Sequence, residues 1–160
     1  KLDAELVELA QQRFDLFAVI SGVADDVHEA GDRDVRLEIR GPSEGAPIQG
    51  DLTRLQRAFL AIFRAVLREM PSNTTVVGER RIERTAGASS AVLVIAAEPL
   101  VQRSYEAPRA PFDEQRGGLG LILPFARRVI ERHGGQIWSP SDERARGAAV
   151  VSLPLPELTS

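Results

Sequence analysis

Two glycines precede a run of helical periodicity near the end of the chain. Gly118 and Gly120 flank Leu119, and the apolar residues that follow recur at helical spacing. Glycine lets backbone N–H groups approach an anion closely, and the N-terminus of a helix adds a favourable dipole. The stretch Arg116–Gly135 therefore predicts a phosphate-binding loop on a helix, with a plain turn that binds nothing as the alternative.

Other residue types that support site chemistry are scarce. The chain has no cysteine, which excludes disulfides and thiolate zinc sites, and His28 and His133 are too far apart for a metal cluster. A net charge of −3 argues against general nucleic-acid binding. We interpret Arg127, Arg128 and Arg132 as a solvated helix face, with a docking surface as the alternative.

The chain has the composition of one globular domain. It has 160 residues, 43% of them hydrophobic, and no apolar run approaches the roughly 20 residues that a membrane helix needs. No leader peptide is visible, and the first residue is not methionine. We expect a cytoplasmic piece of a larger or membrane-anchored protein.

Periodicity predicts alternating helices and strands. Asp15 and Asp51 are expected to cap two of the helices, and Glu98–Gln115 is expected to be a long surface loop. Helices are predicted at Lys1–Gln12, Leu16–Ala30, Leu52–Met70 and from the glycines to Gly134; strands are predicted at Asp34–Arg40, Pro47–Gln49, Thr74–Arg84, Ser90–Ala97, Gln136–Ser139 and Ala148–Leu153. This order favours an α+β two-layer sandwich, with one mixed, mostly antiparallel sheet and helices on one face.

These stretches together resemble a known family. Arg116–Gly135 with the following Gln136–Trp138 resembles the second glycine box, helix and next strand of sensor histidine kinase ATP-binding domains, in the GHKL ATPase group. Gly50–Leu55 is similar to the start of the N-box helix, and Val150–Pro154 to the final strand. The resemblance covers Phe14–Pro154 and implies the histidine-kinase ATPase (Bergerat-type) fold. It implies a domain over 14–156, preceded at 1–13 by the end of a dimerisation helix and followed by a tail at 157–160.

The resemblance also implies where a nucleotide would bind. The N-box asparagine that ligates Mg²⁺ corresponds to Ala65, and the asparagine one turn earlier to Ala61. A methyl group cannot coordinate a hard cation, which requires oxygen. Arg68 occupies the basic position of this box and could still meet a phosphate.

The first glycine box departs from the family pattern. Ala96 stands where the adenine-binding aspartate belongs, and Glu98 and Leu100 stand where its glycines belong. The residual nucleotide site is then Arg68 with Gly118, Leu119 and Gly120, with no catalytic residue and no metal ligand.

These losses predict weak nucleotide binding. They remove about 3–6 kcal/mol, which is two to four decades of affinity. We therefore expect no cofactor, and a pseudokinase-like regulatory or docking module of bacterial two-component signalling. Its expected partners are a response regulator, phosphotransfer protein or kinase, with homodimerisation through the preceding helix. The alternative is a divergent but active domain that binds ATP and Mg²⁺ and phosphorylates a histidine of the parent protein. A pocket for a different small ligand is a third possibility.

Overall fold

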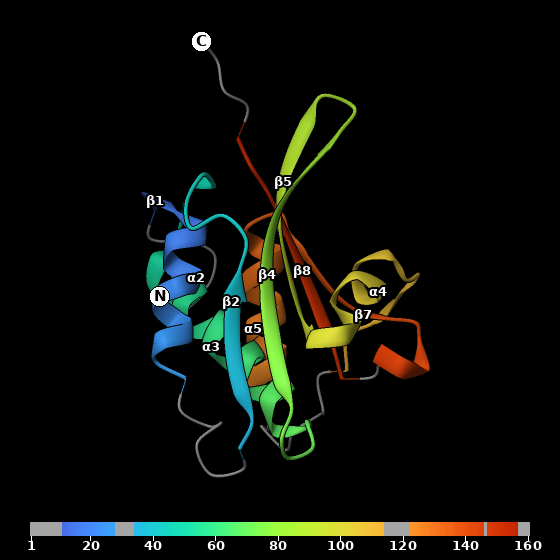
Figure 1. The fold of residues 1–160 in the computed structure, drawn as a ribbon. Coiled ribbons are helices and arrows are strands. Elements are labelled where there is room, and N and C mark those ends of the chain that lie inside the picture. Colours follow the sequence, from blue (N-terminus) through green and yellow to red (C-terminus); the bar gives the residue numbers. More distant parts are fainter. Residues whose placement is uncertain (1–10, 28–33, 114–121, 146, 157–160) are drawn as a thin grey trace.

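A computed structural model describes residues 11–27, 34–113, 122–145 and 147–156. They form a six-stranded mixed sheet in the order β2-β4-β5-β8-β7-β6 and a separate two-stranded ribbon of β1 and β3 (Figure 1). The strands are β1 (Gln12–Asp15), β2 (Arg36–Arg40), β3 (Pro47–Gly50), β4 (Thr75–Thr85), β5 (Ala88–Ala97), β6 (Arg109–Pro111), β7 (Gln136–Pro140) and β8 (Ala149–Pro154). The helices are α2 (Leu16–Asp25), α3 (Leu52–Arg68), α4 (Val101–Glu106) and α5 (Ile122–Arg132), with short 3-10 turns η2 (Glu98–Leu100) and η4 (Glu143–Ala145).

The expected α+β sandwich is confirmed. Only β2 and β4 pair in parallel, and the other neighbouring strands of the large sheet are antiparallel. The helices α2, α3 and α5 pack against one face, which we call the inner face, and bury the main apolar cluster there. Both predicted N-caps are confirmed, because the Asp15 carboxylate accepts from Phe17 N–H and the Asp51 carboxylate from Arg54 N–H.

The opposite, outer face of the sheet is also covered in part. The predicted loop Glu98–Gln115 is wrong over residues 98–111, because that stretch forms η2, α4 and β6. Val101 of α4 and Trp138 of β7 join a second apolar cluster on the outer face of β5 and β8. Figure 1 shows α4 on the other side of the strands from α2 and α3. The helix α4 has only six residues, which is too short for a helical period of apolar residues to predict it from the sequence.

Several predicted boundaries shift by a few residues. The helix predicted over Leu16–Ala30 ends at Asp25, the one predicted to Met70 ends at Arg68, and Gln12 begins strand β1 instead of ending a helix. The rest of the helix predicted at 1–12 lies outside the described residues up to residue 10. The β4–β5 hairpin closes at Ala86 and Gly87, which both adopt positive φ, so its turn is shorter than predicted.

A buried arginine ties the second helix to the sheet. Arg80 of β4 is 5% exposed, and its guanidinium donates to the carbonyl oxygen of Phe17 in α2 at 3.0 Å. It also donates to Ser21 Oγ and to the carbonyl oxygen of Gly41. Burial lowers the pKa of Arg80, but four neutral acceptors, which include the Arg40 carbonyl oxygen, satisfy its donors. Arg80 therefore fixes the end of β2 against α2.

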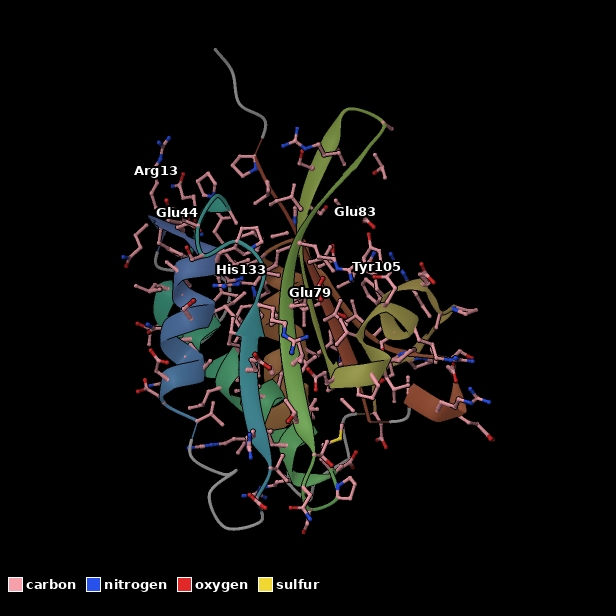
Figure 2. All side chains as sticks on the ribbon, in the orientation of Figure 1. Arg13, Glu44, Glu79, Glu83, Tyr105 and His133 are labelled. Carbon is pink, nitrogen blue, oxygen red and sulfur yellow. The ribbon has the colours of Figure 1, made fainter. Side chains whose placement is uncertain are left out.

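A histidine joins the end of α5 to the start of α3. Asp51 N–H donates to His133 Nε2 at 3.0 Å, so the ring proton lies on Nδ1, which donates to the Val129 carbonyl oxygen at 2.8 Å. A Cβ atom on Gly50 would lie 2.6 Å from the His133 ring. The close approach therefore requires glycine, and Figure 2 shows the ring beside the helical layer.

The contact between Gly50 and the His133 ring predicts that one methyl group added at position 50 strongly lowers the stability of the fold. Gly50→Ala should lower the free energy of unfolding by about 1–3 kcal/mol, because the added Cβ displaces the His133 ring and weakens its bond to Asp51. Urea unfolding measures the change.

The matched control is Gly22→Ala in α2, where nothing lies within 4 Å of the added Cβ. It should raise stability by about 0.5–1 kcal/mol, since alanine favours helix. Equal effects of the two variants would show that the Gly50 contact is unimportant.

Candidate functional site

The second half of α3 carries the positions that the family resemblance assigns to magnesium ligands. Ala65 is 0% exposed and Ala61 is 5% exposed, and both belong to the inner cluster with Leu123 of α5. Neither side chain carries an oxygen. These positions therefore contribute packing between helices and sheet, not metal coordination.

Arg68 is the last residue of α3 and is exposed. A basic side chain in the last turn is favourable beside the negative end of the helix dipole. Arg68 lies on the same helix as Ala65, about one turn further on. The glycine loop that should meet it, with Gly118, Leu119 and Gly120, lies outside the described residues.

The end of β5 places its two alanines on opposite faces. Ala96 belongs to the outer cluster with Val94, whereas Ala97 packs against the inner cluster. Ala65 and Ala96 therefore belong to clusters on opposite faces of the sheet, although Ala96 also lines a hollow together with Met70 of the inner cluster. The alternation of Leu93, Ile95 and Ala97 along one face of the strand could have revealed this from the sequence.

The residues in the places of the box glycines also have other contacts. The Glu98 carboxylate pairs with Arg40 of β2 at 2.5 Å on the outer surface. The hydrogen bonds that Arg40 donates to Glu98 and to Glu38 raise the pKa of Arg40. Leu100 lines a hollow of about 250 Å³ with Met70, Ala97 and others. Glu98 thus ties η2 to the sheet edge.

A second hollow beside the first is acidic. It has a volume of about 490 Å³, and Glu69 lines both hollows. Its other carboxylates come from Asp113, Asp142 and Glu143. The hydrogen bond from Arg103, followed by the Arg144 N–H, lowers the pKa of Asp142, so this carboxylate is charged at neutral pH. Acidic lining disfavours a polyphosphate.

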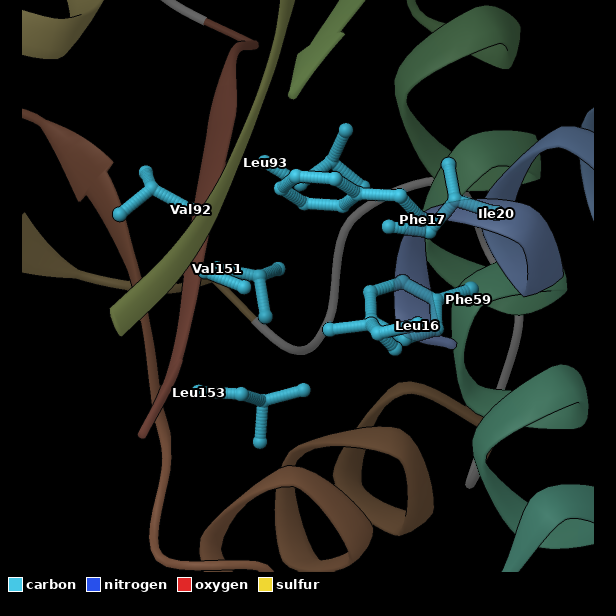
Figure 3. A pocket seen from close by; sticks show the side chains of 9 residues that line it. Leu16, Phe17, Ile20, Phe59, Val92, Leu93, Val151 and Leu153 are labelled. Atoms are coloured by element: carbon cyan, nitrogen blue, oxygen red, sulfur yellow. The ribbon is translucent and has the colours of Figure 1, made fainter. Parts of the chain in front are cut away.

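Figure 3 shows a gap in the core between the helical layer and the sheet. Nine residues line it, all apolar, and the space left between them is too small for a water molecule. Phe17 and Phe59 from the helices meet Leu93 and Val151 from the sheet there. The site is packed core.

The described residues do not fit a magnesium nucleotide. Among them, no group of three or more His, Cys, Asp or Glu side chains could hold a metal ion. The positions that the resemblance assigns to the N-box asparagines carry methyl groups, and Glu69, just after α3, lines both hollows. We therefore derive no chemical step through Mg-ATP.

A polar network on the outer face was not expected from the sequence. Tyr105 of α4 donates its hydroxyl hydrogen to Glu83 of β4 at 2.6 Å, and Arg81 stacks on the Tyr105 ring. Figure 2 shows Glu83 and Tyr105 facing each other. The Glu83 carboxylate raises the pKa of Tyr105. The network holds α4 on the sheet, and the sequence offers no periodic signal for it.

Comparison with known proteins gives one type of relative. No family model matches the chain. Two curated proteins, each described as sensor protein CutS, from Streptomyces coelicolor and Streptomyces lividans, are 32% identical to it. The alignment covers 96% of this chain, which spans 37% of the length of either relative.

Solved structures with the same fold are histidine kinases. The nucleotide-free catalytic domain of ThkA has 18% identity and a TM-score of 0.61, covering 93% of this chain and 95% of that one. The mycobacterial sensor histidine kinase MprB has 21% identity and a TM-score of 0.62, covering 93% and 100%. ThkA in complex with the response regulator protein TrrA has 17% identity and a TM-score of 0.64, covering 92% and 42%. These likenesses establish the fold.

Among the described residues, no helix is long and apolar enough to cross a membrane.

Because Ala96 and Ala97 lie on different faces of β5, we expect a carboxylate at each position to lower the free energy of unfolding by a different amount. Ala96→Asp should lower the free energy of unfolding by about 2–3 kcal/mol, because Ala96 is fully buried beside Val94 of the outer cluster even though it also borders the 250 Å³ hollow. Ala97→Asp, half-buried at the end of the strand, should cost about 1 kcal/mol. Urea unfolding of both variants measures the difference. Equal and small costs would mean that solvent or a polar cavity reaches position 96.

Proposed function

We propose that the chain is a domain of the histidine kinase catalytic (ATPase) type that acts as a pseudokinase-like regulatory or docking module with little or no Mg-ATP binding. The observation that carries the proposal is the buried methyl group of Ala65 at the position of the N-box magnesium ligand. Its neighbour one turn earlier, Ala61, offers no oxygen either. Without these ligands the charge of a triphosphate is not neutralised at this end of the molecule.

The charges around the site support the same proposal. Among the described residues that line the open hollow beside the end of α3, four are acidic and none is an arginine or lysine. The carboxylate of Asp142 is held in its charged form by Arg103. A polyanion would be repelled there, whereas a scaffold for protein contacts does not require a phosphate site.

The partners follow from the type of domain. A response regulator, a phosphotransfer protein or another kinase of a phosphorelay is the expected partner, and a structure of the similar kinase ThkA contains a response regulator. We propose that residues 14–156 form the domain and that the segment before it leads to a dimerisation helix of the parent protein. A cytoplasmic location suits this role.

One observation favours a second function. Arg68 keeps the basic position of the N box and is exposed. With Gly118 and Gly120 it could hold phosphates in a divergent but active domain, whose metal site would then be rearranged. The residual site would use Arg68 and the backbone around Leu119, with Ala65 and Ala96 bearing no ligand.

Nucleotide linkage distinguishes the two functions. At about 1 mM Mg-ATP, a site with a Kd of about 10 µM would stabilise the fold by about 2.7 kcal/mol, and a millimolar site by about 0.4 kcal/mol or less. We expect no more than the smaller value, because ligands for the metal and adenine are missing. Urea unfolding with ATP and with ADP, each with and without Mg²⁺, measures it. A saturable, magnesium-dependent stabilisation would instead establish the active domain.

A further inference from the structure

The strand β2 forms one edge of the six-stranded sheet (Figure 1). It pairs with β4 in parallel, and the Arg36 N–H donates to the Thr74 carbonyl oxygen. Because peptide groups alternate in direction along a strand, the N–H and C=O groups of Leu37 and Ile39 point away from β4. Among the described residues, no strand pairs with this side of β2. The edge therefore offers backbone donors and acceptors to another strand.

The apolar side chains of β2 are incompletely covered. Leu37 and Ile39 pack against the inner cluster, but both remain half-buried. Val76, which lies beside Leu37 on β4, is 0% exposed. The remaining exposure is therefore a property of the edge, and a further strand paired with β2 would cover both side chains.

The other face of β2 carries charges that restrict what can pair with it. Arg36, Glu38 and Arg40 alternate with the apolar residues along the strand. Arg40 binds Glu38 and Glu98, whereas the guanidinium of Arg36 has no hydrogen bond or ion pair with any described residue. Charged side chains on an edge strand oppose pairing with an unrelated strand. A suitable partner must place a carboxylate opposite Arg36 and a cation opposite Glu38.

A second copy of β2 meets this requirement in one register. An antiparallel pair about a two-fold axis through Leu37 places Leu37 opposite its own copy and Val35 opposite Ile39. The outward peptide groups of these residues then meet as hydrogen-bonded pairs. In the same register Arg36 lies opposite Glu38 of the other copy, as a non-hydrogen-bonded pair, in which side chains come closest. The axis provides each of these contacts twice, except that of Leu37 with itself.

The neighbouring registers are less favourable. An axis through Glu38 places this carboxylate opposite itself and Arg36 opposite Arg40, and an axis through Arg36 places that guanidinium opposite itself. An axis through Ile39 would place Glu38 opposite Arg40, but Arg40 is already paired within the chain. That register would also use Gly41, whose φ of 92° is not extended. Charge and backbone geometry thus favour the axis through Leu37.

We propose that β2 pairs antiparallel with β2 of a second copy of this chain, in the register centred on Leu37, so that the two sheets become continuous. The contact involves one pair of short strands, which is less than the area of a stable dimer, and we expect a Kd of about 0.1 mM. Such a contact acts where two copies are already held close together, because a high local concentration compensates for weak affinity. The inference does not depend on whether the domain binds nucleotide.

Amide hydrogen exchange of the full chain at two concentrations tests the proposal. With a Kd of about 0.1 mM, the amides of Leu37 and Ile39 should exchange about fivefold more slowly at about 2 mM protein than at about 20 µM, because these amides exchange from the monomer. Sedimentation equilibrium over the same range should show a monomer and a dimer.

Charge reversal tests the register. Arg36→Glu creates like-charge pairs on both sides of the axis and should weaken self-association about thirtyfold. Combining it with Glu38→Arg restores opposite charges in the same register and should recover the dimer. The matched control Arg84→Glu makes the same charge change at an exposed site near the tip of the β4–β5 hairpin and should leave self-association unchanged. Slow exchange of the β5 amides confirms that each variant is folded.

Several results would overturn the proposal. They are a chain that stays monomeric at about 2 mM, equal effects of Arg36→Glu and Arg84→Glu, and a combined variant that does not recover. Slow exchange at Leu37 and Ile39 that is independent of concentration would show that another part of the chain covers the edge. A dimer without slower exchange at these two amides would use a different surface. Both of these outcomes also contradict pairing through β2.

Discussion

Burial of the central strand β5 on both faces is the constraint on which the rest of the structure depends. Its inner face packs on the α3 layer through Leu93 and Ile95, and its outer face packs under α4 through Val92 and Val94. Because side chains alternate along a strand, a slip of one residue would exchange the two sets and leave both layers without their partners. The pairing of β5 with β4 and β8 therefore fixes which side each terminal residue of the strand faces.

The same packing accommodates alanine at the two positions that the resemblance assigns to magnesium-binding asparagines. Small side chains at Ala61 and Ala65 belong to the cluster that also contains Leu123 and Ala126 of α5. An asparagine there would bring a polar amide that needs partners, and its favourable partner would be the metal that it binds. With alanine, the cluster is apolar and complete without a ligand. In the proposed function, loss of the binding groups and completion of the core are therefore one change.

The sequence predicts the long, periodic elements because each has an apolar face of its own. Both N-capping aspartates and the amphipathic helix α3 were identifiable, and so was the closing pair of strands β7 and β8. The short helix α4 and strand β6 were not, because tertiary contacts such as that of Tyr105 with Glu83 select their conformation. The site stays a prediction, because its glycine loop with Gly118 and Gly120 lies outside the described residues. Of its other positions, Ala65 packs in the inner cluster and Ala96 in the outer one, as the alternation of a strand buried on both faces requires.

The central claim is that the framework of the domain survives while the groups that hold magnesium and adenine are gone. Its most direct test is a series of ¹H–¹⁵N correlation spectra of the full chain with Mg-ATP added to about 5 mM. The account predicts that the amide signals of Ala61, Ala65, Ala97 and Leu123 keep their positions throughout. Saturable shifts that cluster at these four residues, and that vanish when Mg²⁺ is removed, would contradict it.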